Sequence, residues 1–163
     1  MIPDVRTMGL ISGFMPFVLG FIMTIYWWER KTYNGFGRWV VADFAFGIGY
    51  LLIAHRGMIP DFLSITLGNV LAVYAEILIY EGIQRFYNRP FFSRLNYLIL
   101  AAYFLLQLYF TNIAPDINAR TALVSLVFTF LILRSGISLF QCNIPELKRT
   151  SRNAGYIFFL TAL

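Results

Sequence analysis

The chain has 163 residues, of which 59% are hydrophobic, 18% aromatic and 13% charged, and its formal net charge is +5. Soluble domains carry roughly 25% charged residues, so this composition leaves too little polar surface for a water-soluble globule and predicts an integral membrane protein. The basic residues form short clusters between apolar runs, which argues against a nucleic-acid partner and for loops beside an anionic lipid bilayer.

The first apolar run covers residues 8–28 and is long enough to span a bilayer, which takes roughly 20 residues. Its end carries Tyr26, Trp27 and Trp28, a pattern typical of an interfacial aromatic belt. Charged residues 29–31 follow in place of a small-residue cleavage site, so the run predicts a membrane span and not a signal peptide.

The second run covers residues 37–55 and the third covers residues 62–83. Between them, Pro60 favours a turn or a first helical position and Asp61 can cap the next helix. Pro90 ends the third helix because proline cannot continue a helix interior and disfavours helix at the residue before it.

The fourth and fifth runs cover residues 95–111 and 119–140, and a charged loop, residues 143–153, follows them. The last run, residues 154–163, has about half the length of a span, so we expect the chain to be a fragment that ends inside a sixth span. The predicted fold is a single domain, residues 1–163: an all-α, polytopic transmembrane helical bundle with about five complete spans and a truncated sixth.

Basic residues alternate from loop to loop along the chain. The second and fourth loops offer one each, Arg56 and Arg120, whereas the first, third and fifth are rich in them. By the positive-inside rule these odd loops are cytoplasmic and the N-terminus is outside. The residues of the predicted cytoplasmic basic loops are Arg30, Lys31, Arg38, Arg85, Arg89, Arg94, Lys148, Arg149 and Arg152.

Three charged residues, Asp43, Glu76 and Arg134, fall inside the runs at similar depth in the predicted cytoplasmic half. Charges at the bilayer centre cost roughly 2.5–3.5 kcal/mol each on insertion scales, so we expect a Glu76–Arg134 pair with Asp43 nearby. Asn69 completes this predicted intramembrane polar cluster. A static pair that fixes helix register is favoured over a switch driven by protonation or a ligand, and over a proton relay through Glu76.

Small residues recur at four-residue spacing, which allows helix backbones to approach closely. Gly9 and Gly13 form a GxxxG pattern that predicts either dimerisation or packing within the chain. The other predicted helix-packing positions are Ala45 and Gly49 in the second run, and Ser64, Gly68 and Ala72 in the third.

Catalytic and metal-binding signatures are missing from the sequence. Cys142 and His55 each stand alone, so the sequence predicts no intrachain disulfide and no metal site of the usual kinds. It contains no GxSxG, HExxH or P-loop motif. We therefore expect neither a catalytic site nor a cofactor.

Four motifs occur in order: GRWVVADFAFGIGYLL at the start of the second run, HRG-x-x-PD at residues 55–61, Gly68-Asn69, and YEGIQRF at residues 80–86. This order resembles the multi-span N-terminal sensor region that precedes the GGDEF domain in many proteobacterial diguanylate cyclases. The resemblance implies the bacterial inner membrane and a downstream cytoplasmic domain that condenses two GTP into cyclic di-GMP. No GGDEF signature occurs in this chain, so the resemblance implies the input half without catalysis.

These features predict a membrane-embedded sensory module whose helix packing biases dimerisation of a downstream cyclase, with the lipid bilayer and a possible second copy as partners. The alternative is a small transporter or channel-like protein in which Asp43, Glu76 and Arg134 line a path. A purely structural or assembly subunit is the third hypothesis.

Overall fold

The chain folds into helices, and the structure, a computed structural model, describes residues 5–91, 93–142 and 144–162. Helices make up 82% of it, and the described residues form no strand, which confirms the predicted all-α class. The elements are α1 (Val5–Glu29), α2 (Phe36–Ala54), the π-helical segment η1 (Phe62–Leu67), α3 (Gly68–Phe86), α4 (Ser93–Leu108), the π-helical segment η2 (Tyr109–Ile113), α5 (Ile117–Phe140) and α6 (Lys148–Thr161).

Five helical stretches are long and apolar enough to cross a membrane: α1, α2, η1 with α3, α4 with η2, and α5. The protein is therefore a multi-pass membrane protein. The stretches match the five predicted complete spans closely, because the glycines, prolines and charged residues that interrupt the apolar runs also end the helices.

The last helix differs from its prediction. α6 begins at Lys148, well before residue 154, and it is not among the five stretches long and apolar enough to span. No proline or glycine interrupts residues 148–154, so the charged segment continues as helix. Lys148, Arg149 and Arg152 are exposed on its first turns, whereas Ser151 is buried. Residue 163, the end of the predicted sixth run, lies outside the described residues.

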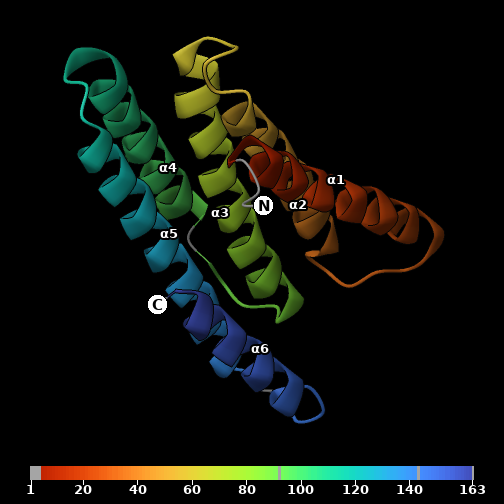
Figure 1. Cartoon of the computed structure of the whole chain (residues 1–163). Coiled ribbons are helices and arrows are strands. Elements are labelled where there is room, and N and C mark those ends of the chain that lie inside the picture. Colours follow the sequence, from red (N-terminus) through yellow and green to blue (C-terminus); the bar gives the residue numbers. More distant parts are fainter. Residues whose placement is uncertain (1–4, 92, 143, 163) are drawn as a thin grey trace.

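Helix α3 lies in the middle of the bundle, with α1 and α2 on one side and α4 and α5 on the other (Figure 1). Helix α6 folds back along α5, so the last described residues lie beside that helix. Helix α3 packs directly against α2, α4 and α5. Any polar group on α3 therefore has three neighbouring helices from which a partner can come.

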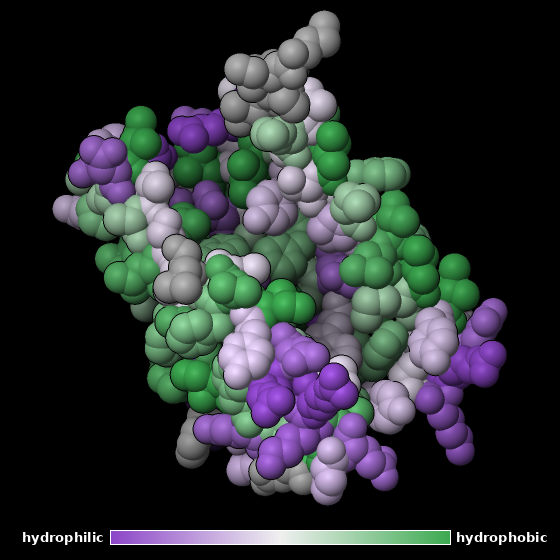
Figure 2. All heavy atoms as spheres, turned by 60° about the horizontal axis from the view of Figure 1, so that its bottom comes forward, coloured by the Kyte–Doolittle hydropathy of each residue, from purple (hydrophilic) through white to green (hydrophobic). Residues whose placement is uncertain are grey.

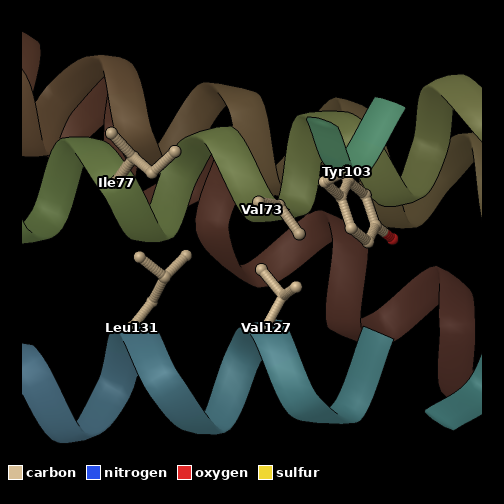
Figure 3. Packing of buried hydrophobic residues seen from close by; sticks show 5 residues of the cluster. All are labelled: Val73, Ile77, Tyr103, Val127 and Leu131. Carbon is tan, nitrogen blue, oxygen red and sulfur yellow. The ribbon is translucent and has the colours of Figure 1, made fainter. Parts of the chain in front are cut away.

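The apolar core on one face of α3 is built from aliphatic side chains four residues apart (Figure 3). Val73 and Ile77 of α3 face Val127 and Leu131 of α5, and Tyr103 of α4 closes the same cluster. Residues spaced by four lie above one another on a helix, so two such pairs align α3 with α5. In a bilayer this contact is held by close packing, because lipid tails are as apolar as the side chains.

Small residues occupy the contact between α2 and α3. A Cβ on Gly49 would lie 2.8 Å from the carbonyl oxygen of Gly68, so the two backbones touch. Ala45 and Ala72 are buried at the same interface. The predicted packing position Ser64 is buried one turn earlier, in η1, and its hydroxyl donates to the carbonyl of Pro60.

The GxxxG pattern of α1 packs against α2 of the same chain. A Cβ on Gly9 would lie 3.0 Å from the Cβ of Ala54, and one on Gly13 would lie 3.0 Å from Cγ of Leu51. Of the two uses that the sequence left open, the structure places these glycines in an intrachain contact.

The odd connections of the chain meet at one end of the bundle, which we call the basic end: the end where α1, α3 and α5 finish. The amide of Asn34 donates to Oδ1 of Asn88 at 3.4 Å, and Arg89 donates to the carbonyl of Ser138 at 2.8 Å. Hydrophilic side chains gather on this end, which comes forward in Figure 2. The sequence placed all nine basic residues in loops, but Arg38, Arg85, Arg94, Lys148, Arg149 and Arg152 lie in terminal turns of helices.

Candidate functional site

The most deeply buried acidic residue of the described chain is Glu81 on α3, which is 0% exposed. Its Oε2 lies 3.2 Å from Nη1 of Arg38 on α2, and its Oε1 accepts a hydrogen bond from Nδ2 of Asn96 on α4 at 3.2 Å. The contact with Arg38 is an ion pair without hydrogen-bond geometry, since Oε2 has no hydrogen-bond donor. One carboxylate therefore joins α2, α3 and α4.

Asn96 extends this connection to α5. Its Oδ1 accepts a hydrogen bond of 2.6 Å from Nη1 of Arg134, while its Nδ2 donates to Glu81. An amide can do both at once because it carries a donor and an acceptor. The guanidinium of Arg134 also lies over the ring of Tyr80, 4.1 Å from its centroid. We call Arg38, Glu81, Asn96 and Arg134 the four-helix network.

The contacts of the four-helix network lower the free-energy cost of placing its charged side chains in a bilayer. An uncompensated ion in the membrane is expensive, and pairing lowers that cost. Glu81 compensates Arg38 directly, and the face of the Tyr80 ring offers Arg134 a cation–π contact. With two arginines and one glutamate, the four-helix network keeps one formal positive charge.

Close packing of α2 on α3 brings Arg38 to Glu81. The next residue on each helix makes this possible: the indole N–H of Trp39 donates to the carbonyl of Ile79 at 3.3 Å, and a Cβ on Gly82 would clash with the indole ring. Glycine is thus required opposite Trp39. The motif YEGIQRF therefore contains both Glu81, the carboxylate of the site, and Gly82, the glycine that leaves room for Trp39.

A second polar layer joins the exits of α3 and α5. Gln84 donates to Oγ of Ser138 at 2.7 Å, and Arg89 donates to the carbonyl oxygens of Ser138 and Gln141. The last carbonyls of a helix lack intrahelical partners and carry partial negative charge, so Arg89 caps α5.

Cys142 lies just beyond that cap, buried and free. Burial alone would raise the pKa of its thiol, but hydrogen bonding with Ser151 and Tyr87 and the nearby charge of Arg89 bring the pKa below its usual value. Tyr87 and Ser151 also share a hydrogen bond, which ties α6 to the exit of α3.

The expected Glu76–Arg134 pair is not formed. Glu76 is 8% exposed, and among the described residues its Oε2 has no hydrogen-bond partner. Arg134 instead reaches Asn96. Two residues at the same depth lie at one level of the bilayer. Whether they meet depends on the face of its helix from which each side chain projects.

The other two members of the predicted cluster lie apart as well. Asp43 is half-buried against Gly20 of α1 and lines an apolar groove of about 360 Å³. Asn69 donates to the carbonyl of Ile65 at 2.6 Å and lines a cavity of about 250 Å³ at the end opposite the basic end. The sequence-based prediction of the polar cluster did not include Glu81 and Asn96. The signal that could have indicated them is the presence of a carboxylate and an amide near the ends of apolar runs.

The fold and this network together define a multi-pass helical membrane protein in which a buried carboxylate on the third span is paired with a partly exposed arginine on the second. No family model matches the chain, and comparisons with curated proteins and with solved structures find no match.

Proposed function

We propose that this chain is a membrane-embedded signal-input module of the bacterial inner membrane, not itself catalytic. In this proposal, helix packing sets the activity of a downstream cytoplasmic domain of the GGDEF diguanylate cyclase type. The observation that carries the proposal is the four-helix network, in which Glu81 contacts partners from two helices at once. A rearrangement of α2 or α4 against α3 must break one of these contacts.

Such a network favours discrete states over gradual motion. Separating Arg38 from Glu81 leaves an unpaired carboxylate in a buried position, which is strongly unfavourable unless another partner replaces it. Packed interfaces of this kind have a small number of alternative arrangements, and a signal acts by changing their populations. Tyr87 and Ser151 connect the exit of α3 to α6, the route by which a change would leave the bundle.

The first test is to read the open reading frame beyond Leu163. A GGDEF-type domain there supports the proposal, and a stop codon after one more span overturns it. The second test measures cyclic di-GMP made by the full-length parent carrying Glu81→Gln, with Glu76→Gln as the matched control. We expect the change at Glu81 to alter the output more, because only that carboxylate joins helices.

A transporter or channel-like role is the second candidate, and one observation favours it. Several buried polar atoms of the described residues have no hydrogen-bond partner, and polar groups of this kind line water-filled paths. Apart from Glu81 Oε2 and Arg85 Nε, they are Thr66 Oγ1, Glu76 Oε2, Tyr103 OH, both amide atoms of Gln107, and Ser135 Oγ. Proton or cation flux into proteoliposomes that Glu76→Gln abolishes would favour this role over the first.

A further inference from the structure

We propose that the basic end holds a binding site for a phosphate-bearing anion. The site is a cavity of about 460 Å³ between the α1–α2 connection and the last turn of α3. It is lined by Arg38 and Arg85 together with Thr32, Tyr33, Asn34 and the ring of Trp27. Among the described residues that line this cavity, none is acidic.

Arg85 supplies the positive charge of the proposed site that no carboxylate of the described residues neutralises. Its Nε atom is buried and has no hydrogen-bond partner, and within the described residues no carboxylate lies at ion-pair distance from its guanidinium. Its guanidinium lies 5.6 Å from the centroid of the Phe91 ring. Among the described residues Arg38 forms an ion pair with Glu81 alone, and its side chain keeps 30% of its surface exposed. Two guanidinium groups therefore border one cavity, and of these two only that of Arg38 has a carboxylate partner among the described residues.

The backbone adds to this positive field. Gly35 precedes α2 with φ of 96°, and Gly35 and Gly37 both line the cavity. The N-terminus of the 19-residue helix α2 therefore opens onto the same space as the arginines. The amides of Phe36 and Arg38 already donate to the carbonyls of Tyr33 and Gly35, so what α2 contributes to a phosphate here is the partial positive charge of a helix N-terminus.

At the basic end itself, a second groove lined by two arginines shows why this cavity is the better candidate. The groove of about 640 Å³ between α3 and α5 is lined by Arg89 and Arg134. Both of these guanidinium groups are already bonded, Arg89 to the carbonyls at the end of α5 and Arg134 to Asn96. Within the part of the chain that the structure describes, Arg85 has no such bond.

The chemistry of the lining points to a phosphate ester. A guanidinium group can bind two phosphate oxygens at once, in a bidentate manner. The hydroxyls of Thr32 and Tyr33 are further donors. Trp27 belongs to the aromatic belt at the end of α1, so the cavity opens at the level where lipid headgroups lie. The phosphate belongs either to an anionic lipid or to a soluble ester, and Arg38 would link its binding to the four-helix network.

The experiment uses the full chain in nanodiscs made of phosphatidylcholine. One arm adds glycerol 3-phosphate or inorganic phosphate and follows tryptophan fluorescence, since Trp27 lines the cavity. The other arm incorporates phosphatidylglycerol and counts retained lipids by native mass spectrometry. Saturable binding in the first arm alone identifies a soluble ester, and selective retention in the second identifies a lipid headgroup.

Arg85→Gln is the test variant, and Arg94→Gln is the matched control, because Arg94 is an exposed arginine at the same end that does not line the cavity. We expect Arg85→Gln to weaken binding at least tenfold and Arg94→Gln to leave it unchanged. Arg85→Lys keeps the charge without the two-pronged geometry and should weaken binding less, which tests the site if the glutamine variant folds poorly. Absence of binding in both arms, or equal loss in both glutamine variants, overturns the proposal. Neither readout requires a downstream cyclase.

Discussion

Arg38 Nη1 and Glu81 Oε2 lie 3.2 Å apart and join the second and third spans at the basic end. The neighbouring residues, Trp39 and Gly82, are in contact beside this pair. The ion pair and the close packing thus depend on one another: a larger residue at position 82 would push the indole away, and with it the helix that carries Arg38.

We predict that Glu81→Gln lowers the stability of the protein more than Glu76→Gln. The amide can still accept from Asn96, but it loses the charge attraction to Arg38 and the charge that strengthens the Asn96 bond, and a hydrogen bond to a charged group contributes about 1.5–3 kcal/mol. Neutralising Glu76 should cost little, because its buried Oε2 has no partner to lose. The measurement is the thermal unfolding midpoint in detergent, and an equal loss in the two variants would contradict the prediction.

Arg134 should be energetically coupled to Asn96 and not to Glu76. A double-mutant cycle of Asn96→Ala with Arg134→Gln should give an interaction free energy of about 0.5–3 kcal/mol, the range for residues in contact. The cycle of Glu76→Gln with Arg134→Gln should be additive to within about 0.5 kcal/mol. Denaturant unfolding of each single and double variant supplies the values. A larger coupling in the second cycle would restore the pair expected from depth alone.

Gly49→Ala should destabilise the contact between α2 and α3. The new Cβ would lie 2.8 Å from the carbonyl oxygen of Gly68, a backbone atom that moves only if a helix moves, and overpacking of this kind costs about 1–3 kcal/mol. Gly136→Ala is the matched control, because its nearest contact is the Phe158 Cβ at 3.3 Å. Thermal unfolding of both variants decides the matter, and a control that loses as much as Gly49→Ala would refute the packing argument.

The thiol of Cys142 should ionise below the pH range of an ordinary cysteine. Hydrogen bonding with Ser151 and Tyr87, together with the charge of Arg89, outweighs the effect of burial and lowers its pKa. Because the thiolate is the reactive form, the midpoint of the alkylation rate against pH should move upward in Ser151→Ala. Cys142 is the single cysteine of the chain, so labelling followed by mass spectrometry reports on it alone. A midpoint that stays in place or falls would show that Ser151 does not stabilise the thiolate.

Particular residues show which span ends and packing positions the sequence predicts. Pro90 and the charged residues between the apolar runs set the ends of the spans, and the four-residue spacing of Gly68 and Ala72 placed a packed face on the third span. The charged start of α6 is a helix where the sequence predicts a loop, because a hydropathy pattern does not distinguish an exposed polar helix from an exposed polar connection.

The sequence by itself determined the all-α class, the five spans and the alternation that groups the basic residues at one end. These properties depend on local composition, because each segment that crosses the bilayer must be apolar and satisfy its own backbone hydrogen bonds. Only the tertiary structure decided that Glu81 and not Glu76 carries the ion pair, and that Asn96 connects it to Arg134. The choice depends on how each helix is rotated against its neighbours, and that rotation follows from packing between residues far apart in the chain, such as Trp39 and Gly82.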